Sequence, residues 1–349
     1  MLSPRLQVIE GQYFRDLMAQ PAAVAATHAA LRESGSWAQI REHIAARSWR
    51  RIVLTGMGAS YHMLHPLNLA LIEAGANPVM IETSELVHYG LKLCEGDTLI
   101  IAVSQSGGSA EMLRLLELNP GAHLLAVTNT ADSRLAAGAD TVLLTRAGPE
   151  FSVSCKTYVT GLLVLQWLAA LFAGRTEAAT LEVLAPAADV IEAYQRRWQP
   201  RTELLAGLLS GVRELFITGR GPSLAAVGAG ALVIKESARF TAEGMSRAAF
   251  RHGPLEMSLR DALTLVYAGE PRTRELNHRL AVELRGRDGK CAEIGADAEC
   301  EPLRIPAVDA ALLPIVEILP VQLLTLALAA LAGREAGRFE HVTKITATE

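Results

Sequence analysis

A serine-rich turn holds the residues of this chain that are best suited to binding a small anion. Thr98–Val103 is an apolar, partly β-branched run, which predicts a strand buried on both faces, as in a parallel sheet. The turn Ser104–Ser109 (Ser-Gln-Ser-Gly-Gly-Ser) follows, and a helical pattern begins at Ala110. Helix N-termini attract anions, hydroxyls add donors, and glycine permits close approach. The turn therefore predicts a cradle for a small phosphate ester, and a plain strand-to-helix connection is the structural alternative.

Three further side chains could move protons or attack a carbonyl group. Glu236 lies in a predicted helix, and a carboxylate can carry a proton between neighbouring carbons. His252 stands in an Arg-His-Gly-Pro turn, and an imidazole can give and accept protons near neutral pH. Lys344 lies near the chain end, and an amine can form a Schiff base. A helix-surface glutamate, a structural histidine and a solvated tail lysine are the corresponding structural interpretations.

Alternating strands and helices must position these residues. Five short apolar runs are expected to be strands: Arg51–Gly56, Pro78–Glu82, Thr98–Val103, His123–Thr128 and Asp140–Thr145. Helical patterns separate them, which favours a doubly wound parallel sheet. Ligands of such sheets bind beyond the carboxyl ends of the strands. Both the Gly-x-Gly-x-Ser turn that ends at Ser60 and the Ser104–Ser109 turn fall there.

The same pattern recurs 163 residues later, at the pairs Gly56–Gly219, Gly58–Gly221 and Ser60–Ser223. Residues 240–243 echo 82–85, and residues 262–268 echo the strand before Ser104, but the serine turn itself is not repeated. An internal duplication predicts two similar α/β domains that have diverged in role. The expected boundaries are an N-terminal helical segment at 1–40, a first domain at 41–186, a linker at 187–201, a second domain at 202–336 and a closing tail at 337–349.

Composition excludes several classes of function. The 349 residues carry a net charge of −4, which gives no electrostatic footprint for nucleic acid or an anionic membrane. The four cysteines form no Cys-x-x-Cys pair, so neither a metal site nor a disulfide framework is expected. The apolar stretch 310–333 contains two prolines and a glutamate, which favours a buried core helix over a membrane span. Met1–Met18 has no signal-peptide pattern, so a cytoplasmic location is expected.

Seven motifs in order resemble the sugar isomerase (SIS) family, and more closely its double-SIS proteins. The resemblance runs from about Gln12 to Glu349 and is carried by Gly58-Ala-Ser-Tyr61, Ser104-Gln-Ser-Gly107, Ala147-Gly-Pro-Glu150, Lys235-Glu236, Phe250-Arg-His-Gly-Pro254, Leu319-Pro-Val-Gln-Leu323 and Lys344-Ile-Thr-Ala-Thr-Glu349. Double-SIS proteins include the isomerase half of glucosamine-6-phosphate synthase and related amino-sugar-phosphate deaminases and isomerases. The resemblance implies two tandem SIS domains, each a doubly wound parallel sheet flanked by helices.

The resemblance also implies roles for particular residues. Glu236 would transfer the proton, Lys344 would form the Schiff base, and His252 would open the ring in the site of a neighbouring subunit, which implies a homodimer. The substrate-binding residues implied are Gly58, Ser60, Ser104, Gln105, Ser106, Ser109, Glu150 and Val153. Two positions depart from the synthase, where a glutamate and a lysine near the sugar are replaced by Ala229 and Val233.

The favoured interpretation is deamination with isomerisation of an amino-sugar 6-phosphate to a ketose 6-phosphate, with no cofactor. Glutamine-dependent synthesis is not expected, because no glutaminase domain and no cysteine at position 2 are present. The alternatives are an aldose–ketose phosphate isomerase, a deglycase of amino-acid-conjugated sugar phosphates, an ammonia-dependent synthase and a non-catalytic sugar-phosphate sensor.

Overall fold

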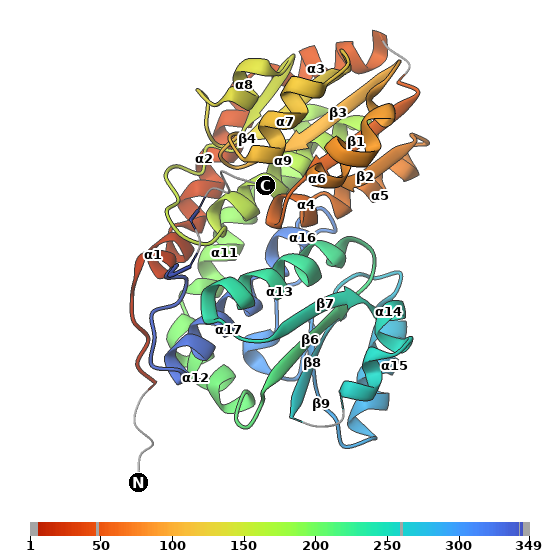
Figure 1. Ribbon diagram of the computed structural model, residues 1–349. Helices are drawn as coiled ribbons and strands as arrows, with labels where there is room; N and C mark the ends of the chain where they lie inside the picture. The colour runs from red at the N-terminus through yellow and green to blue at the C-terminus, as the bar shows by residue number, and fades with distance from the viewer. Residues whose placement is uncertain (1–5, 47–48, 259–260, 342, 345–349) are drawn as a thin grey trace. The chain divides into compact units, whose positions relative to one another are not determined.

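The computed structural model describes residues 6–46, 49–258, 261–341 and 343–344, and it forms two compact units (Figure 1). The β1–β5 unit comprises Ala22–Glu150, Lys156–Pro186 and Thr343–Glu349. The β6–β9 unit comprises Met1–Pro21, Phe151–Cys155 and Ala187–Val342. Each unit is built around a parallel sheet flanked by helices.

The β1–β5 unit contains a five-stranded parallel sheet in the order β2-β1-β3-β4-β5. Its strands are β1 (Arg51–Gly56), β2 (Pro78–Glu82), β3 (Thr98–Val103), β4 (His123–Thr128) and β5 (Thr141–Leu144). Every residue of β3 is buried, as its unbroken apolar run predicts. The strand order reverses between β1 and β3, and this switch point is where open α/β sheets bind ligands.

Helices cover both faces of this sheet (Figure 1). They are α2 (Gln20–Glu33), α3 (Ser36–Ala46), α4 (Ala59–His62), α5 (His65–Glu73), α6 (Thr83–Glu85), α7 (Ala110–Leu118), α8 (Arg134–Gly138), α9 (Lys156–Phe172) and α10 (Glu177–Leu184), with a π-helix η1 (Leu86–Gly90) and a 3-10 helix η2 (Leu91–Cys94). The core between the sheet and α7 joins Ile100 and Leu124 to Met112 and Leu115. The sheet thereby fixes the start of α7, which follows the serine turn directly.

The β6–β9 unit contains a four-stranded parallel sheet in the order β7-β6-β8-β9. Its strands are β6 (Glu214–Gly219), β7 (Ala242–Ser246), β8 (Ala262–Tyr267) and β9 (Lys290–Ile294). Its helices are α1 (Gln12–Met18), α11 (Ala187–Gln195), α12 (Trp198–Leu208), η3 (Gly221–Ser223), α13 (Leu224–Ala238), α14 (Arg247–Arg251), η4 (Pro254–Met257), α15 (Arg274–Arg285), η5 (Glu301–Leu303), α16 (Leu313–Val316) and α17 (Leu319–Leu331). Residues 187–201, expected to be a linker, therefore comprise α11 and the start of α12 with a two-residue turn between them.

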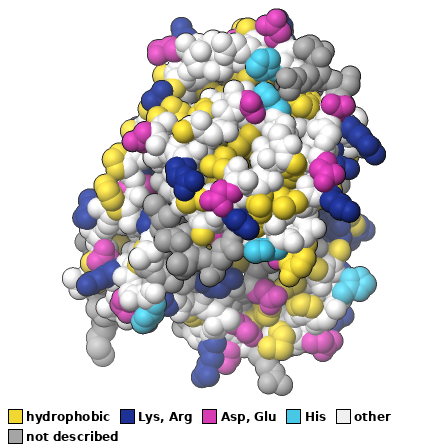
Figure 2. All heavy atoms as spheres, turned by 45° about the horizontal axis from the view of Figure 1, so that its top comes forward, with side chains coloured by type: hydrophobic (Ala, Val, Ile, Leu, Met, Phe, Trp, Pro, Cys, Tyr) yellow, Lys and Arg dark blue, Asp and Glu magenta, His cyan; other side chains and the backbone are white. Residues whose placement is uncertain are grey.

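The apolar C-terminal stretch is a core helix, as expected. Leu313–Leu331 is long and apolar enough to cross a membrane, but 94% of its most apolar window is buried inside the protein. On the face drawn in Figure 2, basic and acidic side chains are interspersed, which agrees with the small net charge. The cytoplasmic location stays a prediction.

Strand register corrects one detail of the expected repeat. Gly56 of β1 pairs with Glu82 of β2, and Gly219 of β6 pairs with Ser246 of β7. Ser246 is therefore the counterpart of Glu82, and the proposed match of residues 240–243 with 82–85 is wrong. The error arose because β7 is an edge strand with one fully buried residue, so no apolar alternation marks its position.

Candidate functional site

The turns after β1 and β3 lie side by side at the switch point of the β1–β5 sheet. The last residues of the two strands, Gly56 and Val103, are paired in register. A Cβ atom on Gly56 would approach Val103 O to 3.0 Å, so the turn after β1 packs closely against the end of β3. Gly58 precedes α4 with a φ of 53°, a conformation that favours glycine. The structure therefore brings Gly58 and Ser60 beside the serine turn, as the sequence predicted.

The serine turn is held in shape by its own hydroxyl groups. Ser104 Oγ accepts a hydrogen bond from Gly107 N at 3.1 Å, and Ser106 Oγ accepts one from Gly108 N at 3.3 Å. Ser109 is the N-cap of α7, but its side chain makes no capping bond. The hydroxyl protons of Ser104 and Ser106 can therefore be donated to a ligand, together with the unpaired N–H groups of the first turn of α7.

Gly107 is the residue on which the shape of the turn depends. Its φ is +59°, and a Cβ atom there would lie 2.3 Å from Ser133 Oγ. Ser133 is in turn the N-cap of α8, accepting a bond from Ala136 N at 3.1 Å. Leu135 N also donates to Gly107 O at 3.1 Å. The turn is thus fitted against the start of α8, and a side chain at position 107 would force one of them to move.

A small pocket lies beyond the ends of β1, β3 and β4. Ser60 and Gln105 line it, together with Asn129, which the sequence reasoning missed. Asn129 Oδ1 accepts bonds from Thr145 Oγ1 at 3.0 Å and Ala147 N at 2.8 Å. Asn129 therefore fixes the start of the Ala147–Glu150 motif at the edge of this pocket. No local pattern marks this asparagine, because its partners lie 16 and 18 residues further along the chain.

Glu150 and Lys344, 194 residues apart in sequence, form an ion pair in this unit. Lys344 Nζ lies 2.7 Å from Glu150 Oε2, and the glutamate side chain is fully buried. Thr157, in the first turn of α9, donates to the same carboxylate through its N at 3.1 Å and its Oγ1 at 2.7 Å. The lysine side chain is 21% exposed. Lys344 is therefore not a solvated tail lysine, and the structure joins it to a residue predicted to line the sugar site.

The other predicted site residues belong to the β6–β9 unit. Glu236 is part-buried on α13, and its charge is one of the weaker causes that raise the pKa of Tyr13, after burial and Cys155. His252 is exposed at the C-terminal end of α14, just before Gly253, whose φ is +143°. Val153 is buried, as are Ala229 and Val233 on α13. The exposure of His252 leaves its imidazole accessible to a ligand or to another chain.

In the β6–β9 unit, carboxyl groups occupy the positions that correspond to the serine turn and to Ser60. After β8, Glu270 Oε1 accepts from Arg272 N at 3.0 Å, and its Oε2 accepts from Thr273 N and Thr273 Oγ1, both at 2.9 Å. Ser223, the counterpart of Ser60, donates to Glu317 Oε1 at 2.8 Å. Burial raises the pKa of Glu317 to about 8, and the nearby Glu270 adds to the rise. The Glu270 side chain thus takes up the N–H groups of the turn after β8, whereas the serine turn after β3 has no such internal carboxylate.

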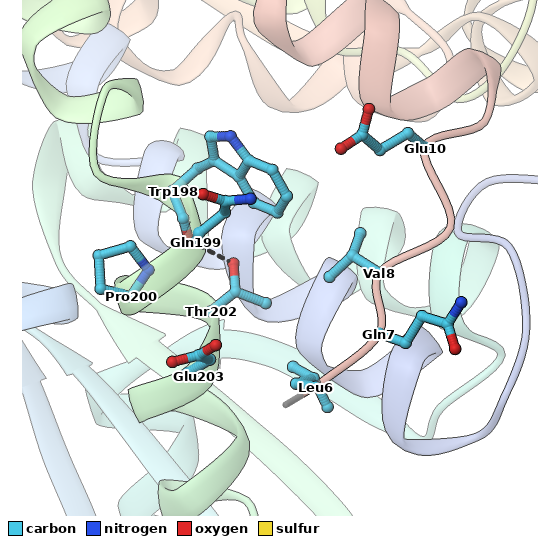
Figure 3. Close-up of a pocket in the computed structure, with 9 residues that line it drawn as sticks. All are labelled: Leu6, Gln7, Val8, Glu10, Trp198, Gln199, Pro200, Thr202 and Glu203. Atoms are coloured by element: carbon cyan, nitrogen blue, oxygen red, sulfur yellow. Dashed lines mark hydrogen bonds between the residues drawn. The ribbon is translucent and has the colours of Figure 1, made fainter. Parts of the chain in front are cut away.

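Another hollow lies in the β6–β9 unit, away from the predicted residues. An extended N-terminal segment and α12 face each other across a hollow of about 370 Å³ (Figure 3). It is lined by Leu6, Gln7, Val8, Glu10, Trp198, Gln199, Pro200, Thr202 and Glu203. Its lining contains no serine cradle and none of the predicted site residues. Within the described part of the chain, no group of three or more His, Cys, Asp or Glu residues is placed to hold a metal ion.

This chain is similar to known proteins over most of its length. Residues 46–171 match the SIS domain. The glutamine–fructose-6-phosphate aminotransferase (isomerizing) of Thermococcus kodakarensis is 32% identical over 328 residues, which cover 89% of this chain and 54% of that protein. This chain spans about half the length of the curated relatives it matches. The SIS match spans the serine turn, Glu150 and most of α9.

Two solved structures have a similar fold. One is the C-terminal domain of glucosamine-fructose-6-phosphate aminotransferase from Francisella tularensis, with a TM-score of 0.84 and 20% identity, covering 95% of this chain and 98% of that one. The other is glucosamine-6-phosphate deaminase from Thermotoga maritima, with a TM-score of 0.76 and 17% identity, covering 97% of this chain and 100% of that one. At these identities the likeness shows the fold, in which parallel sheets are flanked by helices.

Proposed function

We propose that this chain is a sugar-phosphate deaminase and isomerase. It would convert an amino-sugar 6-phosphate of the glucosamine 6-phosphate type, with water, into a ketose 6-phosphate and ammonia. The observation that carries the proposal is that one unit holds both a serine cradle at a switch point and a lysine amine paired with a buried glutamate. A phosphate fits the cradle, and an amine can react with an open-chain carbonyl or imine.

The proposed reaction divides its steps among three side chains. His252 protonates the ring oxygen and accepts the hydroxyl proton, which opens the ring. Glu236 moves the proton from C2 to C1 while a proton of the amine passes to O1, which converts the amino aldehyde into an imine at C2 beside a C1 hydroxymethyl group. The Lys344 amine, having given its proton to Glu150, adds to that imine and ammonia leaves. Water then hydrolyses the lysine imine, which releases the ketose and restores the amine.

Several features support the degradative direction and the assembly. The positions at which the resemblance expects a further glutamate and lysine are Ala229 and Val233, whose side chains cannot exchange protons. One of the proteins with the same fold is named as a glucosamine-6-phosphate deaminase. We also propose that the β6–β9 unit is a second, diverged SIS domain, because β6 and β7 repeat the register of β1 and β2. His252 would serve a second copy of the chain, so a homodimer is part of the proposal.

The test is to incubate the purified chain with a panel of hexosamine and hexose 6-phosphates and to measure ammonia and ketose. Borohydride reduction during turnover should trap the sugar on Lys344, detected as a peptide mass increase, and Lys344→Gln should lose both trapping and ammonia release. Lys290→Gln is the matched control, because Lys290 donates to Ser210 O in the β6–β9 unit and has no part in the site.

Each other outcome selects a different function. Aldose–ketose conversion of unaminated phosphates without ammonia would indicate a simple isomerase, and turnover of amino-acid-conjugated sugars would indicate a deglycase. Net amination of a ketose phosphate by ammonium would indicate a synthase. Binding without any turnover would indicate a sensor, and any of these four results would overturn the deaminase.

A further inference from the structure

Two arginines stand side by side at the carboxyl ends of β6 and β7. Gly219 and Ser246 are paired in register, and Arg220 and Arg247 are the residues that follow them. Adjacent strands lie about 4.8 Å apart, so the two side chains start from neighbouring points on one edge of the sheet. The order β7-β6-β8-β9 places them next to the switch point between β6 and β8. The corresponding positions at the ends of β1 and β2 are Met57 and Thr83.

These two arginines have donors that nothing in the described part of the chain satisfies. The Nε atoms of Arg220 and Arg247 are both buried and have no hydrogen-bond partner there. A buried, unpaired donor of a charged group is costly and requires an explanation, such as a ligand or ion. Two guanidinium groups at one edge present several N–H donors in fixed planar forks, which match the oxygens of a phosphate or carboxylate.

The charged side chains around Arg220 and Arg247 are mostly arginines. Burial lowers the pKa of Arg247, and the charges of Arg220, Arg251 and Arg279 lower it further, in that order, with Glu283 opposing. Glu283 is already held by Arg251 at 2.5 Å and by Arg287 at 3.1 Å. Arg279 lies 4.0 Å from Glu275. These carboxylates are thus occupied by other arginines, and no ion pair joins Arg220 or Arg247 to a carboxylate among the residues that the structure describes.

The turn after β8 cannot offer its N–H groups to an anionic ligand, because the Glu270 carboxylate already accepts hydrogen bonds from Arg272 N and Thr273 N. An anion at this sheet would therefore bind at the β6 and β7 ends instead of the β8 turn. We propose that Arg220 and Arg247 form a second anion site, which takes a dianionic phosphate group, either a phosphate monoester or inorganic phosphate. This proposal does not depend on the proposed reaction, because it concerns a separate set of residues.

The test counts bound phosphate per chain by equilibrium dialysis with radiolabelled inorganic phosphate and, in a second arm, with a radiolabelled hexose 6-phosphate. The wild type should bind two. Arg220→Met/Arg247→Met should bind one, Ser104→Ala/Ser106→Ala should bind one, and the combined variant should bind none. Arg247→Met alone should weaken the second site at least ~10-fold, as expected for the loss of a charged hydrogen bond. Inorganic phosphate binding as tightly as the ester would identify the free ion as the ligand.

The control is Arg213→Met, which removes an exposed arginine that pairs with Asp261 at 3.4 Å in the same unit. It should bind two phosphates. The one phosphate that Arg220→Met/Arg247→Met is expected to keep, at the serine turn, would show that this variant is folded. Two phosphates bound by that double variant would overturn the second site, and so would a loss of self-association with unchanged phosphate binding. A failure of Ser104→Ala/Ser106→Ala to lose a phosphate would instead overturn the cradle in the β1–β5 unit.

Discussion

Replacing Gly107 with alanine should destabilise the β1–β5 unit and abolish phosphate binding at the serine turn. The backbone at Gly107 has a φ of +59°, and a left-handed conformation costs an ordinary residue roughly 1–2 kcal/mol. The new Cβ atom would also lie 2.3 Å from Ser133 Oγ, so either the turn or the start of α8 must move. Displacing Ser133 would remove its capping bond to Ala136 N, which is worth about 1 kcal/mol.

The two costs together amount to about 2–3 kcal/mol of unfolding free energy. The adjacent Gly108 provides the matched control, because a Cβ atom there meets nothing closer than Ser106 O at 3.9 Å. Gly108→Ala should therefore stay within about 1 kcal/mol of the wild type, with any change coming mainly from the stiffer unfolded chain. The contrast between neighbouring glycines isolates backbone conformation and close packing from the general effect of adding a methyl group.

Urea unfolding, monitored by tryptophan fluorescence, measures the stability change in the β1–β5 unit. Three of the four tryptophans, Trp37, Trp49 and Trp167, belong to the β1–β5 unit. Phosphate binding is measured on the folded variants by equilibrium dialysis. The reasoning is refuted if Gly107→Ala matches Gly108→Ala in both unfolding midpoint and phosphate binding.

Three further predictions concern the cradle, the proposed base and a buried carboxyl group. Ser104→Ala/Ser106→Ala should weaken binding of a hexose 6-phosphate by roughly 1.5–3 kcal/mol per lost hydroxyl, measured by calorimetry, and wild-type affinity would rule out the cradle. Glu236→Gln should slow solvent-deuterium exchange at C1 and C2 by at least ~10²-fold, measured by NMR, and an unchanged rate would remove its role. Glu317 ionises near pH 4.5 when unfolded but near 8 when folded, so the wild type loses stability as pH rises between these values. Glu317→Gln should gain in urea midpoint relative to the wild type over that range, and parallel pH profiles would contradict it.

Much of the fold could be predicted from local sequence. The five expected strands of the first sheet and the strands beginning at Glu214 and Ala262 occur in the structure within about one residue of their expected ends. The runs of β1, β3, β4, β6 and β8 are almost entirely buried, and edge strand β2, although only partly buried, still has the apolar run Val79–Ile81. Edge strand β7 could not be placed, because Glu243, Gly244 and Ser246 leave it without an apolar run. The strength of the prediction therefore followed the apolar character of each strand's own residues.

The candidate site was predictable where its parts are contiguous. The sequence itself determined the serine turn, since the run before it, the hydroxyls and the glycines lie within 12 residues. It also marked Glu150 and Lys344, but as separate motifs. Their ion pair, and the anchoring of Ala147 by Asn129, depend on chain segments that meet after folding. Side-chain partners of this kind have no periodicity along the chain that a sequence could display.

The second sheet shows most clearly what tertiary structure decided. The sequence determined that the serine turn is not repeated after residue 268, because the glycines and hydroxyls are replaced there. Only the folded chain shows that Glu270 turns back onto the N–H groups of Arg272 and Thr273 and closes that turn. Only strand register shows that Arg220 and Arg247 emerge at neighbouring points. Local sequence determines which backbone conformations are favourable. Strand register and packing determine which charged side chains, from distant parts of the chain, lie close together in a low-dielectric environment.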